Sequence, residues 1–267
     1  MSNSSSQRIT VLMAIYNCAS TLGEALDSLL AQTYQGFKAV LCDDCSTDDT
    51  YAVANSYVRR FPEKFILIRN KKNSKLPFSL NRCLEYADTE YVARMDGDDI
   101  SKPGRFEKEL KFLDEHPEYA VVSTAMEYFD ENGIFKVGHP VERPSKENFI
   151  GSTPHAHAPA MIRTSVILSV GGYTDERWTR RGQDVHLWAK IYSKGYRGYN
   201  ITESLYMMRD DVSAYKRRNM KEALYAVRRN YEIYKLMNIS YLNIYGLVRP
   251  LLVAMLPKFI YDKLHKL

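Results

Sequence analysis

Cysteine is scarce in this chain, which limits redox and zinc chemistry. The four cysteines among its 267 residues are Cys18, Cys42, Cys45 and Cys83. Cys42 and Cys45 form a C-x-x-C pair, but the carboxylates of Asp43 and Asp44 between them disfavour a reactive thiolate. No further Cys or Cys/His pair has the spacing that would complete a zinc site. We therefore predict small, reduced packing residues rather than redox or metal ligands.

A secretory leader and low-complexity tracts are also missing. Residues 2–7 are polar and carry no charged segment followed by an apolar stretch, so we expect the cytosol as the compartment. The composition, 45% hydrophobic and 26% charged, is that of an ordinary globular protein. A chain of 267 residues can form one large α/β domain, or a domain with an appendage.

Basic residues are concentrated at the C-terminal end. From residue 216 onward there are 11 Lys or Arg against 3 Asp or Glu, whereas the rest of the chain has 26 against 29. A mildly acidic body with a basic tail favours contact of the tail with an anionic surface. The alternative is an ordinary solvated helix face.

Strand and helix patterns alternate over the first 115 residues. Strands are expected at residues 8–15, 37–42, 65–69 and 91–95, and the first reads as a strand buried on both faces. Thr21 and Glu24 offer a capping box for the first helix. Further helices are expected at residues 48–60, started by Ser46 or Thr47, then at 78–87, and from Pro103 to about 115. This alternation predicts a mostly parallel sheet, which binds ligands at the carboxyl ends of its strands.

After residue 118 the pattern indicates a mixed sheet. Strands are expected at 121–128 and 133–137, another within 154–163, and two short ones within 196–208. A short helix is expected at 184–192, and two longer helices at 214–237 and 244–264.

Two acidic clusters follow predicted strands. Asp43 and Asp44 end the second strand, and Asp96-Gly97-Asp98-Asp99 ends the fourth. Cleaving a nucleotide-sugar requires neutralisation of the charge that develops on the diphosphate, and a divalent cation held by one or two carboxylates can supply this. Asp98 and Asp99 are suited to that task. The alternative is an acidic turn or a helix N-cap.

Other side chains fit the remaining needs of such a reaction. Tyr16 can stack on a nucleobase or fill the core, and Asp44 can accept a hydrogen bond from a base or cap the following helix. Asp184, at the start of a predicted helix, can act as a general base or as an N-cap. Spacing alone leaves these alternatives open.

These motifs together resemble family 2 glycosyltransferases over roughly residues 8–210. The resemblance lies in residues 11–17 (V-L-M-A-I-Y-N), 43–48 (D-D-C-S-T-D), 79–82 (S-L-N-R), 91–100 (Y-V-A-R-M-D-G-D-D-I), Pro103, Arg105, 171–173 (G-G-Y) and 183–184 (Q-D). It is strongest to bacterial enzymes of exopolysaccharide (capsule or biofilm matrix) synthesis. The family implies an α/β GT-A fold, a Rossmann-like mixed central sheet flanked by helices. We expect a catalytic domain at 1–213, with a nucleotide-sugar half at about 8–115 and an acceptor half at about 116–213, and a C-terminal helical extension at 214–267.

The resemblance also implies roles for individual residues. By this resemblance the donor nucleotide would be of the uridine type, and it would be bound by Ala14, Tyr16, Asp44, Arg82, Asp96 and Asp98. Asp98 would lie near the ribose, Asp99 would bind Mn²⁺ or Mg²⁺, and Asp184 would be the general base of a single inverting displacement. His157 and Arg209 are candidates for contact with the acceptor or the diphosphate; packing and a surface salt bridge are their respective alternatives.

Two departures from the family pattern bear on the reaction. Gln183 precedes Asp184 where many relatives have Glu, so the base has a neutral neighbour. The Q-x-x-R-W signature of processive polysaccharide synthases is absent after Asp184. Its absence favours addition of a single sugar over chain polymerisation.

The C-terminal segment has amphipathic character. Apolar residues at helical spacing are Ile244, Val248, Leu251, Leu252, Met255, Phe259 and Ile260, and the basic residues among them are Arg249, Lys258, Lys263 and Lys266. The apolar stretch is far shorter than the roughly 20 residues of a membrane span, and Pro250 and Pro257 would kink a helix. We expect these helices to lie on the inner face of the cell membrane, near a lipid-linked saccharide acceptor. Docking on the catalytic domain or on a protein partner is the alternative.

Two other functions compete with sugar transfer. A nucleotidyltransferase would normally have a glycine-rich loop after the first strand, and residues 16–20 contain no glycine. A scaffold or regulatory protein could bind a partner through the basic helices, although the retained Asp98, Asp99 and Asp184 favour an active enzyme. No nucleic-acid ligand is expected.

Overall fold

One mixed sheet organises the molecule. The computed structural model describes residues 7–209 and 220–255. Over these residues nine strands pair in the order β3-β2-β1-β4-β8-β6-β9-β5, and β7 pairs with β6 outside this path. The strands are β1 (Ile9–Ile15), β2 (Phe37–Asp43), β3 (Phe65–Arg69), β4 (Tyr91–Arg94), β5 (Ile100–Ser101), β6 (Tyr119–Asp130), β7 (Gly133–Val137), β8 (Met161–Arg163) and β9 (Arg197–Arg209). Strands β1 to β4 are parallel where they pair, and β8 runs antiparallel to β4 and β6. The predicted mixed sheet is therefore confirmed.

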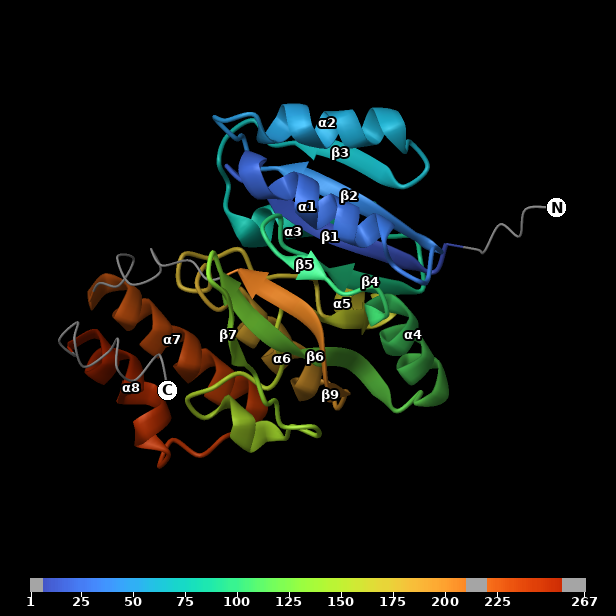
Figure 1. Cartoon of the computed structure of the whole chain (residues 1–267). Helices are drawn as coiled ribbons and strands as arrows, with labels where there is room; N and C mark the ends of the chain where they lie inside the picture. Colours follow the sequence, from blue (N-terminus) through green and yellow to red (C-terminus); the bar gives the residue numbers. More distant parts are fainter. Residues whose placement is uncertain (1–6, 210–219, 256–267) are drawn as a thin grey trace.

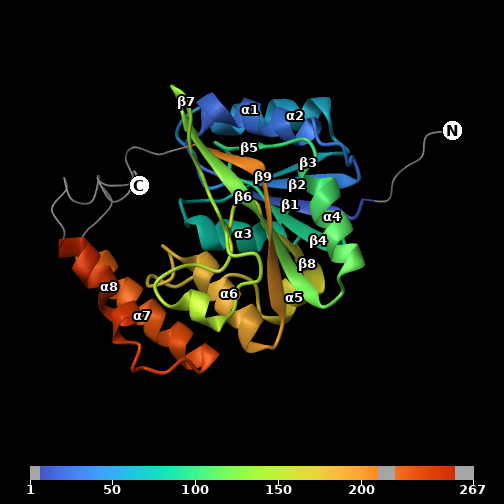
Figure 2. The same cartoon turned by 60° about the horizontal axis from the view of Figure 1, so that its bottom comes forward.

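Helices cover both faces of this sheet. They are α1 (Ala19–Leu30), α2 (Thr50–Arg60), α3 (Leu76–Leu84), α4 (Arg105–Glu115), α5 (Thr164–Ser169), α6 (Gln183–Ser193), α7 (Met220–Met237) and α8 (Ile244–Met255), with a 3-10 turn at Lys146–Phe149. Figure 2 shows α1 and α2 on one side of the sheet and α3, α5 and α6 on the other. Helices α7 and α8 lie side by side at the edge of the molecule (Figure 1).

The core has two layers because β1 is buried on both faces. Val11 and Met13 pack with α1, α2 and α4, whereas Leu12 between them packs with α3 and α6. Each of these three side chains is at most 1% exposed. Side chains alternate across a strand, so a continuous apolar run supplies both layers at once. The prediction of a doubly buried first strand is confirmed.

The predicted capping box of α1 is wrong. The helix begins at Ala19 after Cys18, so Thr21 already lies in its first turn. The Thr21 hydroxyl donates to the carbonyls of Cys18 (3.3 Å) and Gly97 (3.1 Å) instead of accepting a backbone N–H. The helix start thus depends on the loop before it, which packs against the segment after β4.

Helix α2 begins later than predicted, at Thr50 with Asp49 as its N-cap. Ser46 and Thr47 are used by the loop after β1 instead. The Ser46 hydroxyl accepts the Asn17 N–H (3.1 Å), and the Thr47 N–H donates to Asn17 Oδ1 (2.9 Å). These tertiary hydrogen bonds hold both residues outside the helix.

The two short strands expected within 196–208 are one strand, β9. Thr124 of β6 pairs with Ile201, and the next residue, Ala125, pairs with Ser204. Thr202 and Glu203 therefore form a bulge in β9. Both residues are polar and exposed, so in the sequence they resemble a loop between two separate strands. The short elements β5 and α5 were not predicted.

The C-terminal helices are described in part. The predicted segments 214–219 and 256–264 lie outside the described residues, as do Phe259, Ile260, Pro257 and the lysines among them. Helix α8 continues through Pro250 instead of ending there. Within residues 7–209 and 220–255, no helix combines the length and hydropathy needed to cross a bilayer.

Candidate functional site

Both acidic clusters lie at one edge of the sheet. Strand β1 lies between β2 and β4 and is parallel to both, so the three strands end on the same side. Asp43 is the last residue of β2, and Asp96 follows β4 by two positions. Segments that follow neighbouring parallel strands form the usual ligand crevice of such sheets.

Asp44 anchors the loop before α3. It is 4% exposed, and its carboxylate accepts hydrogen bonds from Asn70 Nδ2 (2.7 Å), the Ser74 N–H (2.7 Å) and the Lys75 N–H (2.8 Å). It therefore does not cap α2. A carboxylate that is held rigidly retains lone pairs for one further donor, so contact with a base stays a prediction.

Tyr16 is not a core residue, because its side chain is 46% exposed just beyond β1. Its ring is accessible for stacking at the ligand edge. Ala14, two residues earlier in β1, is half-buried. Arg82 on α3 donates to the Arg69 carbonyl (3.0 Å) and to Asn70 Oδ1 (2.9 Å), which joins α3 to the end of β3. Asn70 thus links Arg82 to Asp44.

The segment 96–99 presents its carboxylates in three different ways. Asp96 forms an ion pair with Arg94, which is buried in β4. Asp98 is exposed, and no other described residue donates a hydrogen bond to its carboxylate. Asp99 is 2% exposed and accepts hydrogen bonds from the Tyr206 hydroxyl (2.9 Å) and the Arg209 N–H (2.8 Å).

These carboxylates repel one another. Burial, then the charges of Asp96 and Asp98, raise the pKa of Asp99 to about 7. Burial and the charge of Asp96 also raise the pKa of Asp98. A divalent cation would relieve this repulsion, and acidic oxygen ligands are what Mg²⁺ and Mn²⁺ prefer.

The donor set therefore fits a cation that takes only part of its coordination from protein. Within the described ranges, no group of three or more His, Cys, Asp or Glu side chains is arranged as a metal site. Asp98 has the free and exposed carboxylate, whereas both oxygens of Asp99 are already hydrogen-bonded. Direct binding of metal by Asp99, as the sequence predicts, would require one of those bonds to be exchanged.

Asp184 lies in the first turn of α6, but it is not the N-cap, which is Gly182 at φ 113°. Burial raises the pKa of Asp184, and the charges of Arg229 and Arg94 partly oppose this rise. A carboxylate with a raised pKa is a stronger base toward an acceptor hydroxyl. The N-cap alternative for Asp184 is therefore wrong, and its role as a base stays a prediction.

Arg94 connects the two halves of the site, and sequence reasoning did not single it out. Its charge acts on Asp96, Asp184 and His157, which come from three separate segments. Its side chain is 3% exposed. An arginine within an apolar, buried strand was the available signal, because such a charge is rarely buried without a partner.

The two histidines of the P-H-A-H-A-P segment differ in role. His155 is 1% exposed, and its ring nitrogens pair with Asn200 Oδ1 (2.7 Å) and the Tyr192 hydroxyl (2.9 Å). His157 is half-buried, and its Nε2 pairs with the Tyr173 hydroxyl (2.9 Å). His155 is structural, whereas His157 lies near Arg94 and stays a candidate for the acceptor or diphosphate.

Arg209 makes contacts on both sides of the acidic segment. Its Nε donates to the Asp98 carbonyl (2.9 Å), and its Nη2 forms an ion pair with Glu24 (2.5 Å). The surface salt bridge considered as an alternative is thus present. Its reach to a diphosphate stays a prediction, and residues 210–213 after it lie outside the described residues.

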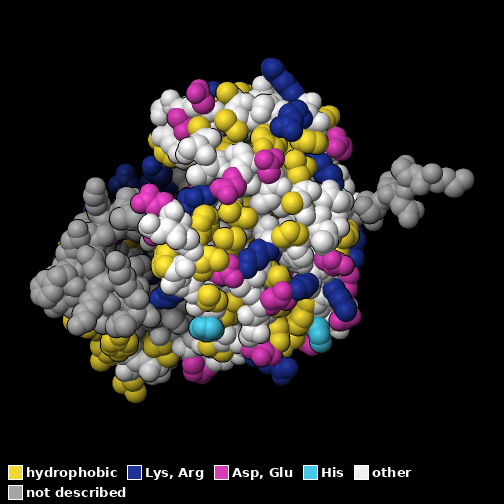
Figure 3. All heavy atoms as spheres, viewed as in Figure 1, with side chains coloured by type: hydrophobic (Ala, Val, Ile, Leu, Met, Phe, Trp, Pro, Cys, Tyr) yellow, Lys and Arg dark blue, Asp and Glu magenta, His cyan; other side chains and the backbone are white. Residues whose placement is uncertain are grey.

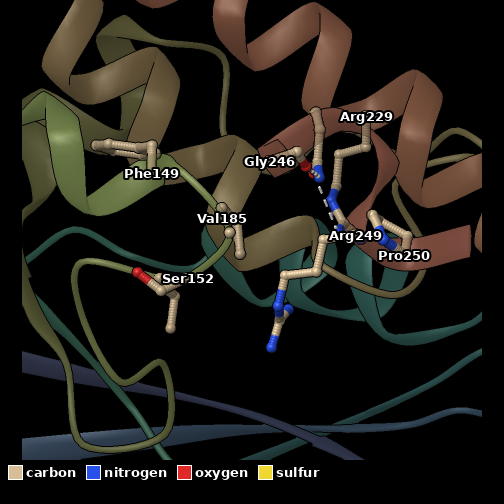
Figure 4. A pocket seen from close by; sticks show the side chains of 10 residues that line it. Phe149, Ser152, Val185, Arg229, Gly246, Arg249 and Pro250 are labelled. Carbon is tan, nitrogen blue, oxygen red and sulfur yellow. Dashed lines mark hydrogen bonds between the residues drawn. The ribbon is translucent and has the colours of Figure 1, made fainter. Parts of the chain in front are cut away.

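A cavity of about 240 Å³ lies beyond Asp184, between the loop 149–153 and helices α6, α7 and α8. Its lining includes Val185, which follows Asp184, and two arginines, Arg229 and Arg249. Figure 4 shows Arg249 extending from α8 into the space between the loop and the helices. Sequence reasoning missed this cavity because its walls come from four separate segments.

Comparison with known proteins gives consistent results. The model of the family described as "Glycosyl transferase family 2" matches residues 10–166. The chain is 37% identical over 262 residues to the putative glycosyltransferase EpsE of Bacillus subtilis, covering 98% of this chain and 94% of that protein. It is 30% identical over 223 residues to an Escherichia coli UDP-Gal:alpha-D-GlcNAc-diphosphoundecaprenol beta-1,3-galactosyltransferase, covering 79% and 77% of the two chains.

A solved structure shows the same fold. The crystal structure of S. aureus TarS residues 1–349 in complex with UDP-GlcNAc superposes with a TM-score of 0.69 at 16% identity. The superposition covers 95% of this chain and 82% of that one. At this identity the similarity is evidence of fold alone.

Proposed function

The chain belongs to glycosyl transferase family 2, and from this membership we propose that it transfers a single sugar from a UDP-sugar to a hydroxyl group of a lipid-linked saccharide. It is a glycosyltransferase with a GT-A fold. The observation that best supports transfer from a UDP-sugar is that three carboxylates, those of Asp96, Asp98 and Asp184, all lie within the electrostatic reach of buried Arg94. The nucleotidyltransferase alternative is set aside by the family. We further propose residues 1–213 as the catalytic domain and 214–267 as a membrane-directed extension.

The donor side would use the edge formed by β1, β2 and β4. Tyr16 would stack on the base, the fixed carboxylate of Asp44 would accept its ring N–H, and Ala14 and Arg82 would line the same pocket. Asp98 and Asp99 would hold Mn²⁺ or Mg²⁺, which when bound neutralises charge on the diphosphate. Asp96, held by Arg94, would complete the pocket.

The acceptor side would use Asp184 as general base. The acceptor oxygen forms a bond to the anomeric carbon as the bond from that carbon to the diphosphate oxygen breaks. The proton of the hydroxyl goes to the Asp184 carboxylate, and UDP leaves with the electron pair. Attack opposite the leaving group inverts the configuration in one step. The raised pKa of Asp184 supports this role, because it strengthens the base.

Two features support a lipid-linked acceptor at a membrane surface. A relative with 30% identity is named for an acceptor carried on diphosphoundecaprenol. Large apolar side chains are exposed on α7, on α8 and on the turn between them, among them Leu242 at 89% and Met255 at 72%. We propose that these helices lie on the inner face of the cell membrane and that the product is an exopolysaccharide. Binding of a protein partner by the same helices is the competing outcome.

The first test is calorimetric titration of UDP into the protein, with Mn²⁺ and then with EDTA. We expect binding with Mn²⁺ and none with EDTA. Asp98→Asn and Asp99→Asn should each weaken binding by at least about tenfold, because each removes a charge beside the cation. Asp130→Asn is the matched control: Asp130 is the last residue of β6, and among the described residues its side chain accepts the Asn132 N–H alone, which asparagine can also do.

The role of Asp184 as general base is tested by measuring sugar transfer from UDP-sugars to a synthetic lipid-linked saccharide with the same protein preparations. Asp184→Asn should still bind UDP, but its transfer rate should fall by about 10²–10⁴-fold. Absence of UDP binding in every condition would refute the uridine-donor assignment. Unchanged transfer by Asp184→Asn would refute the assigned base.

A further inference from the structure

The arginine-lined cavity beside Asp184 has the features of an anion site. Two of its ten lining residues are the arginines Arg229 and Arg249, and none is acidic. Arg249 is exposed and has no ion pair or hydrogen bond with any described residue. The Arg229 Nε is buried without a hydrogen-bond partner. The charge of Asp184 acts on Arg229, but two guanidinium groups against one carboxylate leave the cavity positively charged, and an anion would balance that charge.

The neutral polar side chains of the cavity are already hydrogen-bonded. The Ser152 hydroxyl donates to the Asn148 carbonyl (2.6 Å), the Thr153 hydroxyl to the His155 carbonyl (2.9 Å), and Asn230 Nδ2 to the Gly246 carbonyl (2.8 Å). Arg229 Nη1 donates to the Arg181 carbonyl and Nη2 to Asn230 Oδ1 (3.4 Å), so the buried Nε of Arg229 and the guanidinium of Arg249 are the available donors. A guanidinium group binds phosphate oxygens with paired, charge-assisted hydrogen bonds. The chemistry of the cavity therefore favours a phosphate or diphosphate.

Two glycines allow the arginines to approach the cavity walls. A Cβ on Gly182, before α6, would lie 2.4 Å from Arg229 Nη1. A Cβ on Gly151, in the loop 149–153, would lie 3.3 Å from Arg249 Cδ. Both glycines have positive φ, at 113° and 76°, so other residues would also strain the backbone there. Each arginine thus lies close to a glycine whose backbone conformation other residues rarely adopt.

The position of the cavity matches the geometry of a diphosphate-linked acceptor. Val185 lines it, and Asp184 is the preceding residue of α6. When the accepting sugar is attached directly to a diphosphate, its reacting hydroxyl is separated from the phosphates by a single sugar ring. A base and a diphosphate site must then lie about one sugar apart. Asp184 is also linked to the proposed donor site, because the charge of Arg94, which forms an ion pair with Asp96, acts on it.

The rim of the cavity continues into an apolar surface. Tyr245 on α8 lies beside Gly151, since a Cβ there would be 3.8 Å from Tyr245 Cε1, and Tyr245 is 61% exposed. Leu242 and Ile244, before and at the start of α8, are 89% and 59% exposed. A basic cavity that opens onto exposed apolar side chains is complementary to a charged head group with a hydrocarbon chain.

We propose that the cavity between the loop 149–153 and helices α6, α7 and α8 binds the diphosphate of a polyprenyl-diphosphate-linked acceptor through Arg229 and Arg249, with the chain lying along Tyr245 and the α7–α8 turn. This inference rests on the proposed function, because it assigns the acceptor to the same site. It makes the C-terminal helices part of acceptor recognition.

The test is calorimetric titration of farnesyl diphosphate into the full chain in EDTA, so that no cation can hold the diphosphate at the acidic cluster. Farnesyl diphosphate should bind, and farnesol and inorganic pyrophosphate should bind at least about tenfold more weakly. Arg249→Gln should weaken binding by about tenfold or more, and Arg229→Gln with Arg249→Gln should abolish it. Lys221→Gln with Lys235→Gln removes the same charge from exposed positions of α7 and should leave the affinity unchanged.

Arg249→Gln is the informative variant, because an exposed side chain that forms no hydrogen bond or ion pair with the described part of the chain is not needed for its folding. The unfolding midpoint of this variant should equal that of the wild type. Asp98→Asn should keep farnesyl diphosphate binding, since it alters only the donor site. Equal affinity in the wild type and Arg249→Gln, or farnesol binding as tight as that of the diphosphate, would overturn the proposal. Pyrophosphate binding as tight as that of farnesyl diphosphate would overturn the lipid assignment.

The same preparations distinguish this proposal from the function on which it rests. UDP binding with Mn²⁺ but no arginine-dependent farnesyl diphosphate binding refutes the cavity alone. Arginine-dependent binding without any UDP binding refutes the uridine donor and leaves the diphosphate site standing.

Discussion

Arg94 shows how one buried charge can position a neighbouring carboxylate. Burying a guanidinium is costly unless it is paired, and removing its partner leaves the charge unpaired. Asp96 is that partner, so its carboxylate is held toward β4 while its backbone N–H donates to the Tyr206 hydroxyl (3.2 Å). The orientation of Asp96 therefore depends on Arg94 as well as on its own loop.

His155 is a second residue whose protonation is decided by burial. Its pKa is lowered to about 4 because burial penalises the imidazolium, an effect that the hydrogen bond to Asn200 only partly opposes. In the unfolded chain its pKa is near 6.5. Between these two values the unfolded chain binds more protons, so stability is lost as the pH falls from about 6.5 to 4.

We predict a pH-dependent stability difference between the wild type and His155→Gln. Lowering the pH from 7 to 5 should reduce the wild-type advantage in unfolding free energy by about 2 kcal/mol, because glutamine does not titrate. Urea unfolding at both pH values measures it. Asp99 and Glu109 have raised pKa values and act in the opposite direction. Asp99 and Glu109 are present in both the wild type and His155→Gln, so their contributions cancel in the difference between the two unfolding free energies. A difference that is independent of pH would contradict the neutral, buried imidazole.

At the scale of elements, β9 joins the two halves of the site. It pairs with β6 in parallel and with β5 antiparallel, and its end carries Tyr206 and Arg209 to Asp99. Near its start, Gly198 faces the ring of His155. The strand thus contacts the acidic segment at one end and the histidine network at the other.

We predict opposite effects of alanine at two glycines. A Cβ on Gly198 would lie 2.2 Å from His155 Nε2, and that ring is held by Asn200 and Tyr192, so Gly198→Ala should destabilise the fold by about 2–3 kcal/mol. A Cβ on Gly23, inside α1, would only approach the Tyr57 hydroxyl at 3.7 Å. Gly23→Ala should stabilise by about 0.5–1 kcal/mol. Urea midpoints measure both, and equal shifts in one direction would refute the packing argument.

At the scale of the whole molecule, apolar surface gathers where α7 meets α8. Figure 3 shows a group of hydrophobic side chains at the lower edge of the molecule, near α7 and α8; the middle of the same face carries others, with acidic and basic side chains among them. Leu242, in the turn between α7 and α8, and Ile244, at the start of α8, are 89% and 59% exposed. Exposed apolar groups of this kind mark interaction surfaces, and the adjacent basic cavity favours an anionic membrane.

We predict that Leu242→Ser with Ile244→Ser weakens binding to vesicles of phosphatidylethanolamine and phosphatidylglycerol by at least about tenfold, because two large apolar groups no longer enter the bilayer. Co-sedimentation measures it. Ile134→Ser with Phe135→Ser is the matched control on β7, since both side chains are 53% exposed. UDP binding should be unchanged in both variants. Equal losses, or no vesicle binding by the wild type, would contradict membrane docking through this turn.

Long, periodic segments were predictable, whereas short ones set by tertiary contacts were not. The continuous apolar run of β1 predicts a strand buried on both faces, and the helical spacing of apolar residues in α4 predicts a helix. Both signals lie within the element itself, because burial determines which of its positions are apolar. Helix α2 starts late because Asn17, from a distant loop, binds Ser46 and Thr47. The bulge at Thr202 and Glu203 resembles a loop in sequence, and only the partner strand β6 makes it part of β9.

The candidate site divides in the same way. Sequence alone determined the sheet class and the family, and it placed the carboxylates of Asp44, Asp96 to Asp99 and Asp184 at the ends of elements, because these depend on residue type and local order. Tertiary structure decided which of those carboxylates are free: Asp98 is exposed, whereas Asp44 and Asp99 are hydrogen-bonded by residues far along the chain. It also decided that Arg94 lies between the two halves and that Arg229 and Arg249 share a cavity with the neighbour of Asp184. Contacts between distant segments leave no periodic signal, so only the folded chain reveals them.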